Sequence, residues 1–405
     1  MHIAFITAPA SGHVLPTLPL VQELTRRGHR VTYATSADFG DMIAASGAQL
    51  FALDWSPGRV AASKGGQTTG ELADMLLRSI RSTERVLPSA FARFTADRPD
   101  VIVHDAITVL GSMLAAKLGL PSVSTFPNFA GNDKFDIGTV LLPPDFDPRH
   151  PVFQQYITEM HALAADFGVP ASAVAGAAKT AQLNLVFLPR EFQLHGEVFG
   201  DEFRFIGPSF GIREDSATAL PGGDWEPPAG RRLLFVALGT VVNDRADFFT
   251  TVIKAFGGSD WHVAMAVGHQ VDIAELGEIP ANVDVRPFFP QPEVLRHADV
   301  FLSHTGMGST MEAIMRQVPI VSYPQIAEQS ANGRRVQELG LGRLLDISRD
   351  VDPDELRRTV EEVAADKDIA ANLAAMAEHV RAAGGPPAGA DAIEQLVAGQ
   401  GKAGR

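Results

Sequence analysis

The feature that most constrains the fold of this chain is a strand that runs directly into a glycine-rich turn and a helix. The apolar segment DVFLS, residues 299–303, is short and uninterrupted, which is typical of a strand buried on both faces of a parallel sheet. The turn HTGMGS, residues 304–309, follows it, and residues 309–317 are good helix formers with apolar residues at helical spacing. This order of elements predicts an α/β fold built on a parallel sheet.

The turn is suited to binding a phosphate group. The first turn of a helix has unpaired backbone N–H groups and the positive end of the helix dipole, and Gly306 and Gly308 let an anion approach the backbone. His304 can add a donor, although alone it would also fit a buried core histidine, and Glu312 can accept from a pair of ribose or sugar hydroxyls. The segment STME, residues 309–312, also fits a capping box, in which Ser309 and Glu312 only accept hydrogen bonds from the unpaired N–H groups at the start of the helix. Both interpretations stay open.

A second apolar segment, PIVSYP at residues 319–324, predicts another strand. The polar pair Glu328 and Gln329 follows its end. Ligands of open α/β sheets bind beyond the carboxyl ends of the strands, so we expect this pair near the phosphate turn. A carboxylate accepts from two neighbouring hydroxyls at once, which favours a sugar that keeps its hydroxyls.

The N-terminal half opens with a strand, a helix and a second strand, the start of a doubly wound sheet. His13 lies in the loop beyond the first strand, residues 2–7, and Asp105 follows a later buried strand at residues 100–104. A carboxylate and an imidazole at neighbouring strand ends can form a general base and the group that orients it. Taken singly, His13 would be an ordinary surface residue and Asp105 a helix N-cap.

The chain divides around a segment rich in Gly, Pro and Asp, residues 209–230, which we interpret as an interdomain linker. It separates a first domain, residues 1–208, from a second Rossmann-like domain, residues 231–384, and a final helix occupies residues 385–400. The first strand of the second domain leads to Thr240, whose hydroxyl is a candidate phosphate ligand or a simple turn residue.

Composition excludes several classes of function. The formal charge of −14 argues against nucleic acid or an anionic membrane surface as partner, and the absence of cysteine excludes disulfides and thiol catalysis. The N-terminus has no basic segment before a long apolar run, so we expect a cytoplasmic enzyme without a membrane span. The pair Asp145 and Asp147 imitates a D-x-D metal motif, but it lies in a Pro-rich loop, and no metal is expected.

The pattern H-x-G-x-G-S-x-x-E, the Pro-bounded strand and the closing acid–Gln pair resemble the donor signature of family 1 glycosyltransferases, most nearly the bacterial macrolide and natural-product branch. The resemblance covers nearly the whole chain. It implies the GT-B fold, in which two Rossmann-like domains face each other across a cleft and the last helix crosses back to the first domain. It assigns the diphosphate, ribose and donor sugar to His304, Gly306, Gly308, Ser309, Glu312, Glu328 and Gln329.

The resemblance also implies the remaining parts of the site. The ring of Phe288 would stack on the base, with Phe289 and Gln291 beside it, and His13 and Asp105 match the catalytic dyad. Acceptor binding falls in the N-terminal half, where the expected residues are Phe126, Asn128 and Phe129.

The implied reaction is inverting and independent of metal or cofactor, with His13 as general base. It moves a hexose, expected to be glucose from UDP-glucose, to a hydroxyl of a macrolide, flavonoid or other phenolic acceptor. This sequence has Gly308 where plant members have Asn and Glu328 where they usually have Asp, so a dTDP-deoxysugar donor stays open. Three other possibilities are a noncatalytic sugar-nucleotide-binding protein, an epimerase of the same fold, and a serine hydrolase using Ser209 of the G-x-S-x-G segment.

Overall fold

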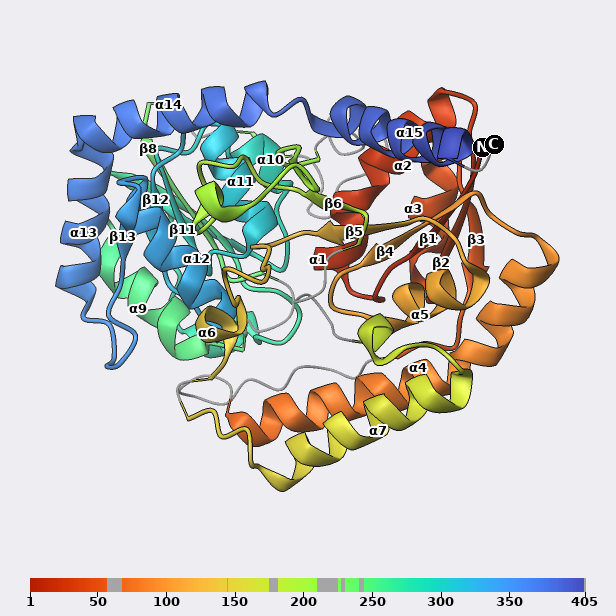
Figure 1. Cartoon of the computed structure of the whole chain (residues 1–405). Coiled ribbons are helices and arrows are strands. Elements are labelled where there is room, and N and C mark those ends of the chain that lie inside the picture. Colours follow the sequence, from red (N-terminus) through yellow and green to blue (C-terminus); the bar gives the residue numbers. More distant parts are fainter. Residues whose placement is uncertain are drawn as a thin grey trace. The chain divides into compact units, whose positions relative to one another are not determined.

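The computed structural model of the chain describes residues 1–56, 68–143, 145–174, 181–209, 225–226, 230–239 and 244–403. These residues form two compact units (Figure 1). Among the described residues, the first unit combines those up to residue 209 with those from Val380 onward, and the second contains those from residue 225 to His379.

The first unit is built on a seven-stranded parallel sheet in the order β3-β2-β1-β4-β5-β6-β7. Every residue of β1, β4 and β6 is buried, which explains why these strands are mostly apolar. Strand β1 lies between β2 and β4, so the connections that leave β1 and β4 diverge at this point, where α/β folds bind ligands. The strands are β1 (His2–Ile6), β2 (Arg30–Thr35), β3 (Gln49–Ala52), β4 (Val101–Asp105), β5 (Ser122–Phe126), β6 (Leu183–Val186) and β7 (Phe203–Phe205).

Helices cover this sheet, and two long ones, α4 and α7, lie side by side (Figure 1). The helices of the first unit are α1 (Ser11–Val14), α2 (Leu18–Arg26), α3 (Gly40–Ala45), α4 (Thr69–Ala96), α5 (Val109–Leu118), α6 (Gly138–Leu141), α7 (Pro151–Phe167) and α15 (Gly385–Ala403). Helix α4 continues through an internal proline, Pro88. Burial of Leu87, Ala90 and Phe94 offsets the cost of about 3 kcal/mol that an internal proline carries.

The last helix, α15, packs against α2, as the fold prediction requires. Arg27, at the end of α2, contacts Asp391 at 2.6 Å and Glu394 at 3.0 Å. His29 Nε2 lies 2.7 Å from Glu394 Oε1. These ion pairs and the buried Ile393 attach the C-terminal segment to the first unit.

The second unit contains a six-stranded parallel sheet in the order β10-β9-β8-β11-β12-β13. Strands β8 and β11 are neighbours in it, with Ala237 opposite Ser303 at their carboxyl ends. The strands are β8 (Arg232–Ala237), β9 (Trp261–Ala266), β10 (Val283–Arg286), β11 (Val300–Ser303), β12 (Ile320–Ser322) and β13 (Gly342–Leu344). The helices are α9 (Ala246–Phe256), α10 (Gln291–Val294), α11 (Met307–Met315), α12 (Ala327–Glu338), α13 (Pro353–Ala365) and α14 (Lys367–Ala382). Within the ranges that the structure describes, no helix is both long and apolar enough to span a bilayer.

Candidate active site

The structure brings His13 and Asp105 together at the carboxyl ends of β1 and β4. His13 lies in the one-turn helix α1 beyond β1, and Asp105 is the last residue of β4. His13 Nδ1 lies 2.7 Å from Asp105 Oδ2; the carboxylate is 1% exposed and the imidazole 22%. A buried carboxylate on one ring nitrogen fixes the imidazole orientation and leaves the other nitrogen to accept a proton.

The N-cap interpretation of Asp105 is wrong. Helix α5 begins only at Val109, and its N-cap residue is Thr108. Asp105 Oδ1 instead accepts from the backbone N–H of Ile107 at 3.2 Å. This turn holds one carboxylate oxygen and leaves Oδ2 directed at His13.

A buried polar pair supports the segment that carries His13. Thr17 Oγ1 donates to the Val14 carbonyl at 2.7 Å and lies 2.6 Å from the Tyr33 hydroxyl. Since the Thr17 proton goes to Val14, the Tyr33 hydroxyl is left to donate to Thr17. Burial raises the pKa of Tyr33, which keeps its hydroxyl protonated as this arrangement requires.

In the second unit, the capping-box interpretation of Ser309 and Glu312 is wrong. Helix α11 begins at Met307 with Gly306 as its N-cap, so Ser309 lies inside the first turn. Gln291 Nε2 donates to Ser309 Oγ at 3.1 Å and to Glu312 Oε2 at 2.6 Å. Three residues predicted to bind the nucleotide sugar are therefore linked by hydrogen bonds beside the N-terminus of α11.

His304 fills the space between two glycines at the ends of β8 and β11. A Cβ atom at Gly239 would lie 2.6 Å from His304 Nε2, and one at Gly306 would be closer still. Gly239 also has a φ of +80°, which favours glycine there, whereas a side chain at residue 306 would displace the His304 ring. Burial lowers the pKa of His304 from 6.5 to about 4, so the imidazole is neutral at physiological pH and can donate one hydrogen bond.

The lowered pKa of His304 makes a prediction about stability. Between about pH 6.5 and about pH 4 the unfolded chain binds a proton at His304 that the folded chain does not, so stability should fall as pH falls through this window. Melting curves at pH 7 and pH 5 should therefore show a smaller pH effect in His304→Gln than in the wild type. The exposed His161 provides the control His161→Gln, and equal pH effects in both variants would contradict this account.

Helix α12 anchors the turn that follows His304. Thr305 has a φ of +58°, a strained value for a β-branched residue. Its hydroxyl donates to the Gln329 carbonyl at 2.9 Å, and its own carbonyl accepts from Asn332 Nδ2 at 2.9 Å. Sequence reasoning missed Asn332, although its spacing of three from Gln329 places both on one helix face.

Glu328 and Gln329 lie in the first turn of α12, beyond the end of β12. Gln329 is 7% exposed, and its Oε1 accepts from the Gln325 backbone N–H at 2.8 Å. No hydrogen bond within the described parts of the chain uses Gln329 Nε2. The Gln329 carboxamide is therefore oriented so that Nε2 can donate to a ligand, and the partly buried Glu328 precedes it in the chain.

The predicted base-binding rings have different environments. Phe288 is partly buried, and the exposed His269 meets it edge to face with ring centroids 4.8 Å apart. Phe289 is 5% exposed and packs on Phe235, so its ring is part of the core and not a stacking surface. Thr240 lies outside the described residues.

The predicted acceptor residues are mostly core. Phe126 packs on Phe203, and Phe129 stacks on Phe192 with ring centroids 5.9 Å apart; both predicted rings are 4% exposed. Asn128 is partly buried and accepts from the Phe129 backbone N–H at 2.7 Å. Of these three residues, Asn128 alone keeps side-chain surface for a ligand.

The D-x-D segment takes part in local structure. Asp145 Oδ1 accepts from the Thr69 backbone N–H at 3.1 Å, at the start of α4. Asp147 Oδ1 accepts from the Arg149 backbone N–H at 2.9 Å. Both carboxylates stabilise the loop that leads into α7.

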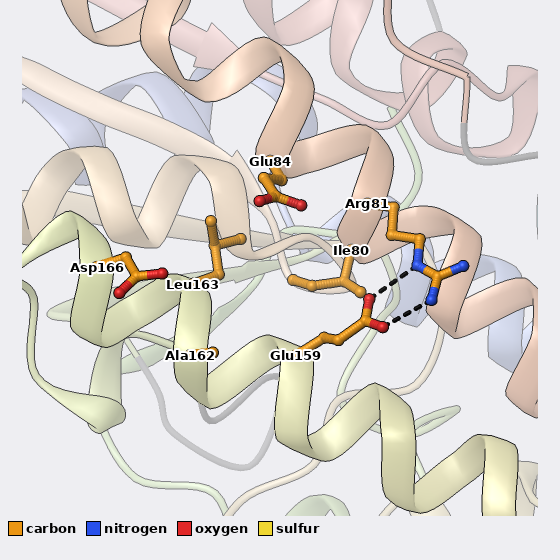
Figure 2. Close-up of a pocket in the computed structure, with 7 residues that line it drawn as sticks. All are labelled: Ile80, Arg81, Glu84, Glu159, Ala162, Leu163 and Asp166. Atoms are coloured by element: carbon orange, nitrogen blue, oxygen red, sulfur yellow. Dashed lines mark hydrogen bonds and ion pairs between the residues drawn. The ribbon is translucent and has the colours of Figure 1, made fainter.

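A separate hollow of about 480 Å³ lies between α4 and α7 (Figure 2). Arg81 crosses it to Glu159 with two hydrogen bonds of 2.8 and 2.6 Å. Glu84 and Asp166 add two further carboxylates. Three acidic groups against one guanidinium disfavour a diphosphate here, so this hollow is no alternative nucleotide site.

Comparison with known proteins agrees with this arrangement. The family described as "Erythromycin biosynthesis protein CIII-like, C-terminal domain" matches residues 250–398. NDP-glycosyltransferase YjiC of Bacillus subtilis is 35% identical over 400 residues, which span 98% of this chain and 97% of that protein. Demethyllactenocin mycarosyltransferase of Streptomyces fradiae is 36% identical over 411 residues, covering 98% and 86%. The crystal structure of CalG4, the calicheamicin glycosyltransferase, has a TM-score of 0.83 at 31% identity, with 98% of both chains covered.

Two parallel α/β sheets, with polar groups gathered at the carboxyl ends of their strands, define a glycosyltransferase of the GT-B class. The similarity to YjiC and to the mycarosyltransferase extends over almost the full length of this chain and identifies the branch of the class. The chain belongs to the bacterial macrolide and natural-product branch of the family 1 glycosyltransferases.

Proposed function

We propose that this glycosyltransferase moves a hexose from a nucleoside diphosphate sugar to a hydroxyl of a small natural-product acceptor in the cytoplasm, with inversion at the anomeric carbon. The contact of 2.7 Å between His13 and the buried Asp105 carries the proposal. His13 removes the proton of the acceptor hydroxyl as that oxygen attacks the anomeric carbon, and Asp105 stabilises the imidazolium that forms. The bond between the anomeric carbon and the diphosphate oxygen breaks, and the nucleoside diphosphate leaves.

The second unit would hold the donor. The first-turn N–H groups of α11 and the neutral His304 supply fixed donors for the charge that grows on the leaving diphosphate. These donors would do the work that a metal ion does in other transferases, so we propose a metal-independent reaction. Glu312, oriented by Gln291, would bind the ribose, and the partly buried Phe288 would stack on the base.

The acceptor would meet an apolar surface beside the dyad. Ile107 is 62% exposed, and its backbone N–H is the one that binds Asp105. An exposed large apolar side chain this close to the general base suits a macrolide or phenolic acceptor. The similarity to CalG4, the calicheamicin glycosyltransferase, supports a natural-product acceptor.

For the donor we propose UDP-glucose. The Glu328 carboxylate, which can accept from neighbouring hydroxyls, and the Nε2 donors of Gln329 together suit a sugar that keeps vicinal hydroxyls. A dTDP-deoxysugar is the second candidate, because a mycarosyltransferase is among the similar proteins.

Glu328→Ala should lower kcat/KM for UDP-glucose by about tenfold or more and leave the affinity for free UDP unchanged, because UDP lacks the hexose. Steady-state kinetics and a calorimetric UDP titration measure the two effects. Glu338, exposed at the other end of α12, provides the control Glu338→Ala. Equal losses for UDP and UDP-glucose, or a wild-type preference for a deoxysugar donor, would remove Glu328 from the sugar site.

The other possibilities have less support. A noncatalytic sugar-nucleotide-binding protein would not need His13 and Asp105 in contact, and an epimerase would turn over the nucleotide sugar without an acceptor. The two relatives from Bacillus subtilis and Streptomyces fradiae named above are glycosyltransferases, which leaves the serine hydrolase using Ser209 without support.

A further inference from the structure

A chain of polar side chains connects Arg245 to Gln329 in the second unit. We propose that Arg245 is a positioning residue for the donor sugar: acting through Gln325, it fixes the carboxamide of Gln329 so that the Nε2 donors face the sugar. The inference rests on the proposed function, because it takes Gln329 as a ligand of the hexose.

Arg245 is held in one orientation. It precedes α9, and its side chain is 23% exposed. Its Nε and Nη2 donate to the two oxygens of Asp247 at 2.9 and 3.1 Å, and its Nη2 also donates to the Tyr323 hydroxyl. Its Nη1 donates to Gln325 Oε1 at 2.8 Å. The planar guanidinium reaches all three partners at once, which a lysine ammonium could not do in the same plane.

Gln325 transmits this orientation. It is 8% exposed, so its carboxamide is shielded from solvent and forms its hydrogen bonds with protein groups. Its Oε1 faces the Arg245 cation, and its Nε2 donates to the Tyr323 carbonyl at 2.9 Å. If the carboxamide were flipped, its NH2 group would face the Arg245 guanidinium, which is also a donor. Its oxygen would then face the Tyr323 carbonyl oxygen, which is also an acceptor. The residue is therefore fixed at both ends, and its backbone N–H holds Gln329 Oε1 at 2.8 Å.

Tyr323 and Gln325, the partners of Arg245, lie just beyond the carboxyl end of β12, and the neighbouring strand β11 leads into the glycine-rich turn at residues 304–309. Tyr323 directly follows β12, whose Ser322 is opposite Ser303 of β11, the residue before His304. The Tyr323 ring stacks on Phe248 of α9 with centroids 3.7 Å apart. Because Asp247 neutralises Arg245, the guanidinium is poorly suited to bind the diphosphate itself, and its effect on catalysis passes through Gln325.

A double-mutant cycle tests the proposal. Arg245→Met should raise KM for UDP-glucose by about tenfold, with a smaller change in kcat and an unchanged Kd for free UDP. In a Gln329→Ala background the same substitution should have no further effect, because Gln329 is the group that Arg245 positions. Arg245→Lys, which keeps one donor for Gln325, should recover part of the loss. The control is Arg349→Met, which removes an exposed arginine that also binds two carboxylates.

Additive losses in the cycle, or an equal loss of UDP affinity in Arg245→Met, would overturn the proposal. A crystal structure of Arg245→Met separates this inference from the function on which it rests. If Gln329→Ala keeps the wild-type KM, the sugar-site assignment fails, and the crystal structure then decides the positioning role alone. A Gln329 Oε1 that leaves the Gln325 N–H supports the role of Arg245, and an unmoved Gln329 carboxamide contradicts it.

Discussion

Replacing His13 by alanine should lower turnover by about 10² or more and leave the affinity for UDP unchanged. The reason is that a general base acts on the acceptor hydroxyl, whereas the residues that we propose to bind the nucleotide belong to the second unit. Asp105→Asn should act in the same direction, because the amide cannot stabilise the imidazolium 2.7 Å away.

The choice of acceptor decides how clearly this effect is seen. A phenol of low pKa ionises without help and would mask the loss of the base, so an aliphatic hydroxyl is the appropriate acceptor. The exposed His161 on α7 provides the control variant His161→Ala. Wild-type turnover of His13→Ala with an aliphatic alcohol would show that the base lies elsewhere.

Glu312→Ala should weaken the binding of UDP by about 1.5 to 3 kcal/mol, the worth of a hydrogen bond to a charged group. The structure removes the competing explanation, because α11 starts at Met307 and Glu312 does not cap it. Its Oε2 instead accepts from Gln291 at 2.6 Å, which orients the carboxylate beside the glycine-rich turn at residues 304–309. Calorimetric titration of UDP into the folded variant measures the loss.

A purely structural role would give a different pattern. The melting temperature of Glu312→Ala would fall while UDP affinity stayed at the wild-type value. Glu312→Gln separates charge from shape, since the amide can retain a contact to Gln291 and loses the negative charge that binds a ribose hydroxyl pair most strongly. A wild-type UDP affinity in both variants would exclude Glu312 from the ribose site.

The proximity of His13 and Asp105 is predictable because both follow strands in the most regular part of the fold, whereas their roles as base and partner come from the resemblance to the glycosyltransferase family. Runs of buried apolar residues identified the strands that precede His13 and Asp105, and parallel topology places such strand ends on one edge. The strand Gln49–Ala52 was not recognised, since it lies at the edge of the sheet and none of its residues is fully buried.

Local sequence patterns do not predict which side chains become buried or hydrogen-bonded through tertiary packing. Ser309 and Glu312 have the spacing of a capping box, yet the helix starts three residues earlier than that box requires, because Gly306 and not Ser309 takes the N-cap position. Phe126 and Phe129 lie in a segment that suggested an acceptor site, but their rings fill the core. Arg245 lies 80 residues from Gln325, and no periodicity connects residues so far apart.

The most direct test of this account is the product of the reaction itself. UDP-glucose is incubated with a panel of macrolide and phenolic acceptors that includes an aliphatic alcohol, and the products are analysed by mass spectrometry and by NMR at the anomeric carbon. The account predicts an acceptor that gains one hexose with inverted configuration, release of UDP, and loss of this product in His13→Ala with the aliphatic acceptor. Consumption of UDP-glucose without a glycosylated acceptor, or a product with retained configuration, would contradict it.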